Sequence, residues 1–208
     1  MLEYILVILI FLFSVILHEV SHGFMAYYLG DPTAKDAGRL TLNPLKHLDP
    51  VGSVLFPLML ILFNSRIIFG WAKPVPINPF NLQHKKYGEA KVAIAGPLVN
   101  ISIAIFFGLL IRFFPWGYST FEINLISIFG YICWINLLLA IFNLIPIPPL
   151  DGSHILFTLL PRSADEIKIF LSRYGFFILI FFIFFLFRYI IPIINFIFRL
   201  IVGQSFIG

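Results

Sequence analysis

Long apolar runs alternate with short polar segments along the whole chain. Several of these runs approach or exceed the roughly 20 residues that a helix needs to span a bilayer. The pattern predicts four membrane-spanning helices, at residues 2–29, 92–114, 123–145 and 174–191. Residues 192–208 are also apolar but contain Pro192 and Arg199, so we expect them to lie along the membrane interface or against a partner.

A fifth apolar run, residues 51–63, is shorter and is interrupted by Pro57. As a helix it would extend only about 20 Å, and a crossing there would place its two flanking loops on opposite sides of the membrane. Those loops, 30–50 and 72–91, contain seven Lys and Arg residues, which favours the cytoplasmic side for both. We therefore expect residues 51–71 to form a re-entrant hairpin, the alternative being a short span.

The composition agrees with a multi-pass membrane protein in a bilayer. Hydrophobic residues make up 60% of the chain and charged residues 12%, whereas charged residues are roughly 25% of soluble domains. The first apolar run begins with the acidic Glu3 and has no small-residue cleavage site, so we expect a retained helix, not a secretory signal peptide. No long linker divides the chain, so residues 1–208 are predicted to form one domain.

The charges and the cysteine count disfavour two other kinds of protein. The net charge is +4, but the basic residues lie mostly in the loops, which indicates membrane orientation and not a nucleic-acid partner. By the same rule the first helix would run from the outside to the inside of the plasma or inner membrane. The single Cys133 excludes an intramolecular disulfide and a thiolate metal site, so we expect it to pack as a small apolar residue.

Three ionisable residues, His18, Glu19 and His22, interrupt the first apolar run. An ionisable group inside a membrane helix costs roughly 2.5–3.5 kcal/mol and usually marks function. His18 and His22 are four residues apart, so on a helix both imidazoles can reach one metal ion. This HExxH pattern is typical of zinc metalloproteases, in which the glutamate acts on a bound water as the general base.

A catalytic zinc ion generally takes three protein ligands, and Asp151 is the best candidate for the third. It follows an apolar span that three prolines break, and broken helices at membrane depth usually line a cavity. An equally supported interpretation is that Asp151 caps a short helix at residues 153–160. His47 and His84 lie in polar loops, and we interpret His154 as a packed bystander.

Taken together, these motifs resemble the site-2 protease family of intramembrane zinc metalloproteases, in the short type that lacks a PDZ domain. The resemblance is carried by HEVSHG at 18–23, GRLTLNPLKHLDPVG at 38–52, GWAKPVPINP at 70–79, AGPLVN at 95–100 and NLIPIPPLDG at 143–152. It implies an all-α polytopic fold with a three-helix catalytic core, about residues 1–161. Residues 162–208 would form a C-terminal membrane extension that the family's motifs do not cover.

The resemblance also implies roles for individual residues. His18, His22 and Asp151 would bind one zinc ion per chain, and Glu19 would be the base. Asn143 would hold the substrate or the developing oxyanion. The implied substrate is a transmembrane protein, hydrolysed within or near its membrane segment.

Two further segments bear on this interpretation. The alternation in GRLTLN, residues 38–43, favours equally an edge strand that binds an extended substrate and a plain loop. Gly96, Pro97 and Asn100 predict a close-packing face against the first helix, because small residues let membrane helices approach. Asn100 is also a candidate to line the site.

Two other functions use the same residue types. Two histidines and one carboxylate also describe the facial triad of iron oxygenases, although the sequence shows no obvious cosubstrate site. Intramembrane His and Asp residues also serve metal and proton transporters, although no second half of the chain repeats the motif as an inverted-repeat transporter would. The sequence leaves a homo-oligomer open and does not name the substrate.

Overall fold

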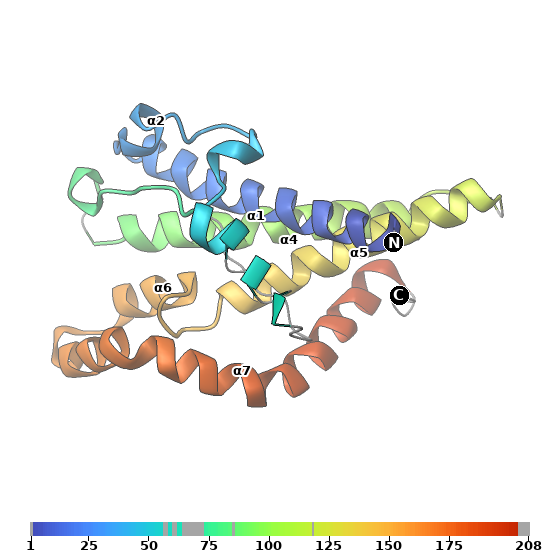
Figure 1. The fold of residues 1–208 in the computed structure, drawn as a ribbon. Coiled ribbons are helices and arrows are strands. Elements are labelled where there is room, and N and C mark those ends of the chain that lie inside the picture. The colour runs from blue at the N-terminus through green and yellow to red at the C-terminus, as the bar shows by residue number, and fades with distance from the viewer. Residues whose placement is uncertain are drawn as a thin grey trace.

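The structure is a computed structural model that describes residues 2–55, 58–59, 62–63, 73–84, 86–117 and 119–203. These residues form a bundle of helices (Figure 1) and include no strand. The elements are α1 (Leu2–Tyr28), α2 (Thr33–Asp36), η1 (Pro44–Lys46), η2 (Pro50–Leu55), η3 (Pro79–Asn81), α4 (Gly88–Phe113), α5 (Thr120–Asn143), α6 (Asp151–Leu159), η4 (Arg162–Ala164) and α7 (Asp165–Val202). The predicted all-α polytopic class is confirmed.

Three helices of the bundle are long and apolar enough to cross a membrane, namely α1, α4 and α5. They correspond to the first three predicted spans, with boundaries that differ by a few residues. Helix α4 packs against both α1 and α5, and α1 also contacts α5 directly. At the start of α5, the Ser119 side chain accepts a hydrogen bond from the backbone N–H of Glu122, whose carboxylate bonds back to Ser119 in a capping box.

The fourth predicted span, residues 174–191, is only the middle of a longer helix. Helix α7 has 38 residues, and it bends by 74° between its Asp165–Ile183 and Arg188–Val202 parts (Figure 1). As far as residue 202, the segment 192–208 continues α7. Its buried side chains Ile194, Phe198 and Val202 contact α4 and α5, so one face of the segment packs inside the chain, while Ile193, Phe196 and Leu200 remain exposed.

One apolar cluster joins the second part of α7 to α4 and α5. Its buried members are Ala104, Ile111, Cys133, Leu137, Ile190, Ile194, Phe198 and Val202. Cys133 is a free, fully buried thiol in this cluster, as the sequence predicted. Beside the cluster, the Arg112 guanidinium donates a hydrogen bond to the Leu200 carbonyl (2.7 Å), which attaches the last turn of α7 to α4.

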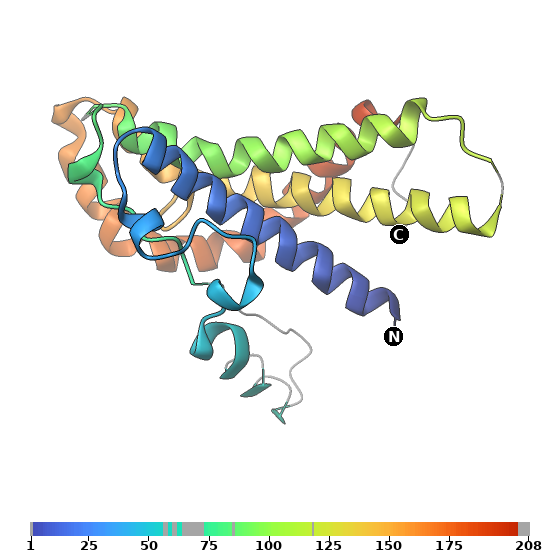
Figure 2. The same ribbon diagram turned by 90° about the horizontal axis from the view of Figure 1, so that it is seen from above.

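The loops that follow α1 and precede α4 lie at the same end of the bundle (Figure 2). The backbone N–H of Gln83 donates to the Leu29 carbonyl (2.9 Å), and that of Lys73 donates to the His47 carbonyl (2.9 Å). This agrees with two basic loops on one side of the membrane. The re-entrant hairpin predicted at residues 51–71 lies largely outside the described residues.

Residues 38–43 form turns and bends, so the edge-strand prediction is wrong and the loop alternative holds. Gly38 has a positive φ of 62°, which interrupts an extended backbone. The Asn43 side chain accepts a hydrogen bond from Leu45 N (3.0 Å), and Thr41 Oγ accepts one from Asn43 N (3.2 Å). Such local side-chain bonds satisfy the backbone groups that a strand would use for pairing.

Candidate metal centre

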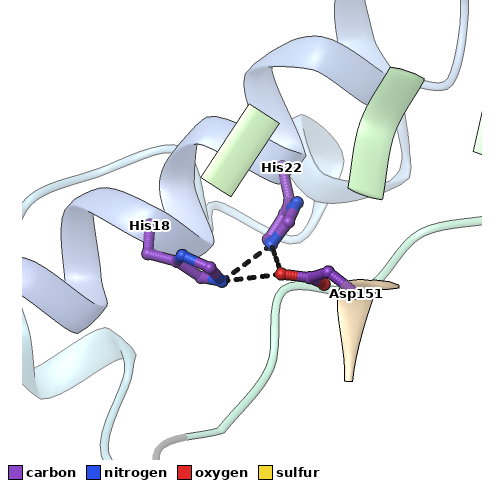
Figure 3. A group of neighbouring side chains, drawn as sticks. All are labelled: His18, His22 and Asp151. Atoms are coloured by element: carbon purple, nitrogen blue, oxygen red, sulfur yellow. Dashed lines mark hydrogen bonds and ion pairs between the residues drawn. The ribbon is translucent and has the colours of Figure 1, made fainter. Parts of the chain in front are cut away.

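His18 and His22 on α1 meet Asp151 from the first turn of α6 (Figure 3). The two Nε2 atoms are 3.0 Å apart, and Asp151 Oδ2 lies 3.1 Å from that of His18 and 3.3 Å from that of His22. Both histidines are 6% exposed. Residues from distant parts of the sequence thus bring three ligand-type atoms to one point between the helices.

The outer nitrogens of both imidazoles are already used. His18 Nδ1 donates to Asn100 Oδ1 (2.6 Å), and His22 Nδ1 donates to the Val92 carbonyl (2.7 Å). A neutral imidazole carries only one N–H, so both Nε2 atoms present a lone pair to the cluster. Asp151 Oδ2 is buried and accepts no hydrogen bond from the residues that the structure describes. Three lone-pair atoms therefore converge, and a single cation would satisfy all of them.

The spacing of these three atoms fits a zinc ion. Tetrahedral zinc with bonds of about 2.0–2.1 Å separates neighbouring ligand atoms by about 3.3 Å. The observed separations of 3.0, 3.1 and 3.3 Å lie close to this value. Two nitrogens and one oxygen also form a common catalytic zinc set, with the fourth position left for water or substrate.

Gly96 explains how α4 comes so close to the cluster. A Cβ atom at this position would lie 2.5 Å from His22 Nε2 and 2.6 Å from His18 Cε1. Any side chain here would therefore occupy the space of the two imidazoles. Gly96, Pro97 and Asn100 are all buried, which confirms the predicted close-packing face, and Asn100 bonds directly to His18.

Asp151 is positioned by the tight turn between α5 and α6. A Cβ atom on Gly152 would overlap the carbonyl oxygens of Leu144 and Ile145, so the glycine lets α6 start directly against the end of α5. The helix-cap interpretation of Asp151 is wrong, because the N-cap residue of α6 is Leu150 and the helix start has no side-chain capping bond. The Asp151 carboxylate points instead to the imidazoles (Figure 3).

Glu19 lies beside the cluster and shares with it a cleft of about 390 Å³. Its Oε2 atom accepts a hydrogen bond from the backbone N–H of Val75 (2.9 Å). Val75 stands between Pro74 and Pro76, so it is the only residue of the three that has an N–H to give. We did not predict this contact, although a lone N–H between two prolines is a signal that the sequence contains.

Asn143 and His154 also line this cleft, outside the three-atom cluster. The Asn143 amide nitrogen donates to the Leu139 carbonyl of its own helix (2.9 Å). This bond, and not a contact with the imidazoles, orients the amide group. His154 is exposed, with Nδ1 3.6 Å from a Glu89 carboxylate oxygen. We interpreted His154 from the sequence as a packed bystander, and so did not predict that it lines the cleft.

Asp31 fixes the segment that carries Val75 to the end of α1. Its carboxylate accepts hydrogen bonds from the backbone N–H of Asn78 (2.7 Å), from the Asn81 amide (2.9 Å) and from Thr33. Burial alone would raise the pKa of the Asp31 carboxyl, but the bonds from Thr33, Asn78 and Asn81 outweigh it and lower the pKa below its ordinary value. The charged form of Asp31 thus stabilises one wall of the cleft.

Comparison with known proteins identifies the family. Residues 117–184 match Peptidase family M50. Over 180 residues the chain is 39% identical to the "Putative zinc metalloprotease YwhC" of Bacillus subtilis (strain 168), and the match covers 85% of this chain and 78% of that protein. The chain belongs to peptidase family M50. As a member of family M50, the site-2 proteases, it is a zinc metalloprotease with several membrane-spanning helices.

Other relatives match over a smaller part of their own length. The chain is 31% identical over 150 residues to the "Putative zinc metalloprotease Rip2" of Mycolicibacterium smegmatis, covering 72% of this chain and 55% of that protein. It is 46% identical over 68 residues to the "Putative zinc metalloprotease MJ0611" of Methanocaldococcus jannaschii, 33% of each chain. No solved structure matches. The family, the enzyme class and the zinc cofactor are thus confirmed, which sets the oxygenase and transporter alternatives aside.

Proposed function

We propose that this protein hydrolyses a peptide bond within or near the transmembrane segment of another membrane protein, as one step of regulated intramembrane proteolysis. The observation that carries the proposal is the convergence of His18, His22 and Asp151 inside a helix bundle, next to a carboxylate in the same cleft. His18 and His22 lie within the α1 segment that is long and apolar enough to span a membrane. A substrate bond would therefore be reached at membrane depth.

His18, His22 and Asp151 are the proposed ligands of one zinc ion. When bound, zinc would polarise the scissile carbonyl and make an attacking water more acidic. Glu19 would take the proton of that water and pass it to the leaving amine, while the Val75 N–H holds its carboxylate in place. Asn143 lines the cleft and would hold the substrate backbone or the developing oxyanion.

The Glu19→Gln variant tests the chemistry. We expect it to keep zinc and the fold but to lose cleavage of a defined transmembrane substrate, because the amide cannot accept the proton. Zinc per chain and cleavage would be measured in the same detergent-solubilised sample. Glu166→Gln is the matched control, since Glu166 is an exposed residue at the start of α7. Full cleavage by Glu19→Gln would refute the mechanism, and loss of zinc would make Glu19 a metal ligand.

The active site is proposed to face the cytoplasmic side of the cell membrane, where the basic loops around it would lie. Single cysteines at Lys35 and Lys86, in a Cys133→Ser background, can be labelled with a membrane-impermeant reagent from either side. Both positions should react from the cytoplasmic face only. Reaction of either one from the outside would contradict this orientation, and reaction of the two from opposite faces would show that residues 51–71 cross the membrane.

The substrate can be found by comparing the membrane peptides released by cells with the wild-type enzyme and with Glu19→Gln. Peptides present only with the wild type should end within or near a predicted transmembrane segment. Released peptides that all derive from soluble proteins would contradict the proposed substrate class.

A further inference from the structure

Two asparagines are fully buried in the membrane-spanning helices next to the metal centre. Asn100 on α4 and Asn136 on α5 are each 0% exposed. A buried amide is costly unless its hydrogen bonds are satisfied, so their partners show what the two residues do. Only Asn100 touches a proposed ligand, whereas nothing in the family's motifs or in the cluster itself involves Asn136.

The hydrogen bonds of these asparagines run in one direction. Asn136 Nδ2 donates to the Ile132 carbonyl (2.9 Å) and to Ser14 Oγ (2.9 Å). Because a carbonyl can only accept, the Asn136 amide is oriented with Oδ1 toward Asn100, whose Nδ2 donates to it (2.7 Å).

The orientation of Asn100 follows from that of Asn136. Its Nδ2 also faces the Ser14 carbonyl (3.4 Å), a second pure acceptor. The Asn100 oxygen is therefore the atom that faces His18, and it accepts from His18 Nδ1 at 2.6 Å. Two main-chain carbonyls thus determine, through two amides, which nitrogen of His18 carries the hydrogen.

We propose that Asn136 is a positioning residue of the metal centre, which acts through Asn100 to keep His18 in the Nδ1–H form with the Nε2 lone pair free. The inference rests on His18 being a zinc ligand, as in the proposed function. Without an acceptor on Asn136, the Asn100 amide can turn so that its nitrogen faces His18. His18 Nδ1 would then accept, and the hydrogen would move to Nε2, the atom that must bind zinc.

Through Asn136, α5 also helps to position the metal ligands. Helix α5 supplies none of the three cluster residues, yet Asn136 ties it to α1 through Ser14 and to α4 through Asn100. Partners that orient a ligating histidine typically change metal affinity by about 10–100-fold when removed. Because Asn136 acts through Asn100, we expect the lower end of this range.

Imidazole ¹⁵N shifts of the zinc-loaded, full-length protein report directly which nitrogen of His18 carries the hydrogen. The His18 signals are assigned by their loss in His18→Gln. Wild-type His18 should be in the Nδ1–H form. In Asn136→Leu, the Nε2–H form should appear and zinc affinity, measured by chelator competition, should fall about 10-fold. Asn136→Asp keeps an acceptor oxygen toward Asn100, and its carboxyl group, when protonated in this buried site, can still donate to the Ile132 carbonyl, so it should retain the wild-type form.

Asn195→Leu is the matched control. The Asn195 oxygen accepts from Trp134 Nε1 (3.0 Å), so this variant also removes a side-chain hydrogen bond between membrane helices, but away from His18. It should leave the ¹⁵N pattern and zinc affinity unchanged. An Nε2–H form in the wild type would overturn the proposal, as would a folded Asn136→Leu with wild-type zinc affinity. If instead His18→Gln binds zinc normally, the ligand assignment itself fails, and neither readout depends on proteolysis.

Discussion

Helices α4 and α5 each contribute to two very different environments. In the polar region next to the metal centre, Asn100 and Asn136 join a chain of hydrogen bonds that leads to His18. In the apolar region packed against α7, the same helices contribute Ala104, Ile111, Cys133 and Leu137. The polar region depends on the direction of individual hydrogen bonds, whereas the apolar region depends on contact area. We therefore expect substitutions in the polar region to act on zinc and those in the apolar region to act on stability.

The largest expected effect is that of Asp151→Asn in the polar region around the metal centre. A neutral amide is a much poorer zinc ligand than a carboxylate, so zinc affinity should fall by more than about 100-fold, beyond what removal of an orienting partner causes. Zinc per chain after dialysis against a mild chelator measures it. Asp165→Asn, at an exposed position of α7, should retain zinc. Retention of zinc by Asp151→Asn would remove this residue from the site.

Two glycines of α4, one in the polar region and one in the apolar region, allow these regions to be compared by the same substitution. In Gly96→Ala the new methyl group meets both imidazoles, so zinc affinity should fall about 10–100-fold. In Gly108→Ala it lies 2.5 Å from Ile201 Cγ2 on α7. This overpacking should cost about 1–3 kcal/mol of stability with zinc affinity unchanged. A fall in zinc affinity for both variants would show that the polar and apolar regions are not independent.

A cavity in the apolar cluster should have a smaller effect. Ile194 is 0% exposed, and Ile194→Ala should lower the free energy of unfolding by about 1–2 kcal/mol. This is below the usual range for buried large-to-small changes, because lipid offers the unfolded helix an equally apolar environment. Unfolding in a denaturing detergent measures it, and the exposed Ile193 provides the control Ile193→Ala. Zinc affinity should not change in either variant.

The smallest effect should be that of Asp31, and it should depend on pH. The folded-state pKa of Asp31 is lowered from its ordinary value of 3.8, so its stabilisation is fully present above that value and is lost as the pH falls through the folded pKa. Asp31→Asn should cost about 1 kcal/mol at neutral pH, and the difference from wild type should shrink below about pH 4. Unfolding of the metal-free protein at several pH values tests this, with the exposed Asp36→Asn as the control. A difference that grows in acid would contradict it.

Much of the fold and site could be predicted because the signals are local. The lengths of the apolar runs gave α1, α4 and α5, and the four-residue spacing of His18 and His22 gave the shared face on α1. Asp151 was recognisable as a ligand candidate because a carboxylate that follows a proline-broken span is expected to face a cavity. The helix-cap alternative could not be removed from the sequence, since it depends on where the carboxylate points.

The failures involve contacts between distant segments. Pro192 suggested that the last span ends there, but packing of Ile194 and Phe198 against α4 and α5 continues α7 past it. The alternation at residues 38–43 is compatible with a strand, and only the local bonds around Asn43 decide against it. The roles of Val75 and Asn136 depend on their hydrogen-bond partners in the folded chain. The spacing of apolar and polar residues along the sequence does not reveal these partners.

The first part of α7 lies behind the turn that carries Asp151. Leu179 packs on Ile147 and Leu150, and Gly175 is so close to Pro148 that a Cβ there would lie 2.7 Å from its carbonyl oxygen. The family match extends to residue 184, so the expectation that the family covers the chain only to about residue 161 was wrong. A chain cut after Pro161 would keep His18, His22 and Asp151 and yet lose the surface against which the turn before Asp151 packs. We therefore expect the first part of α7 to be needed to hold Asp151 in place, and a homologue with a shorter C-terminus would have to support its proline turn by other contacts.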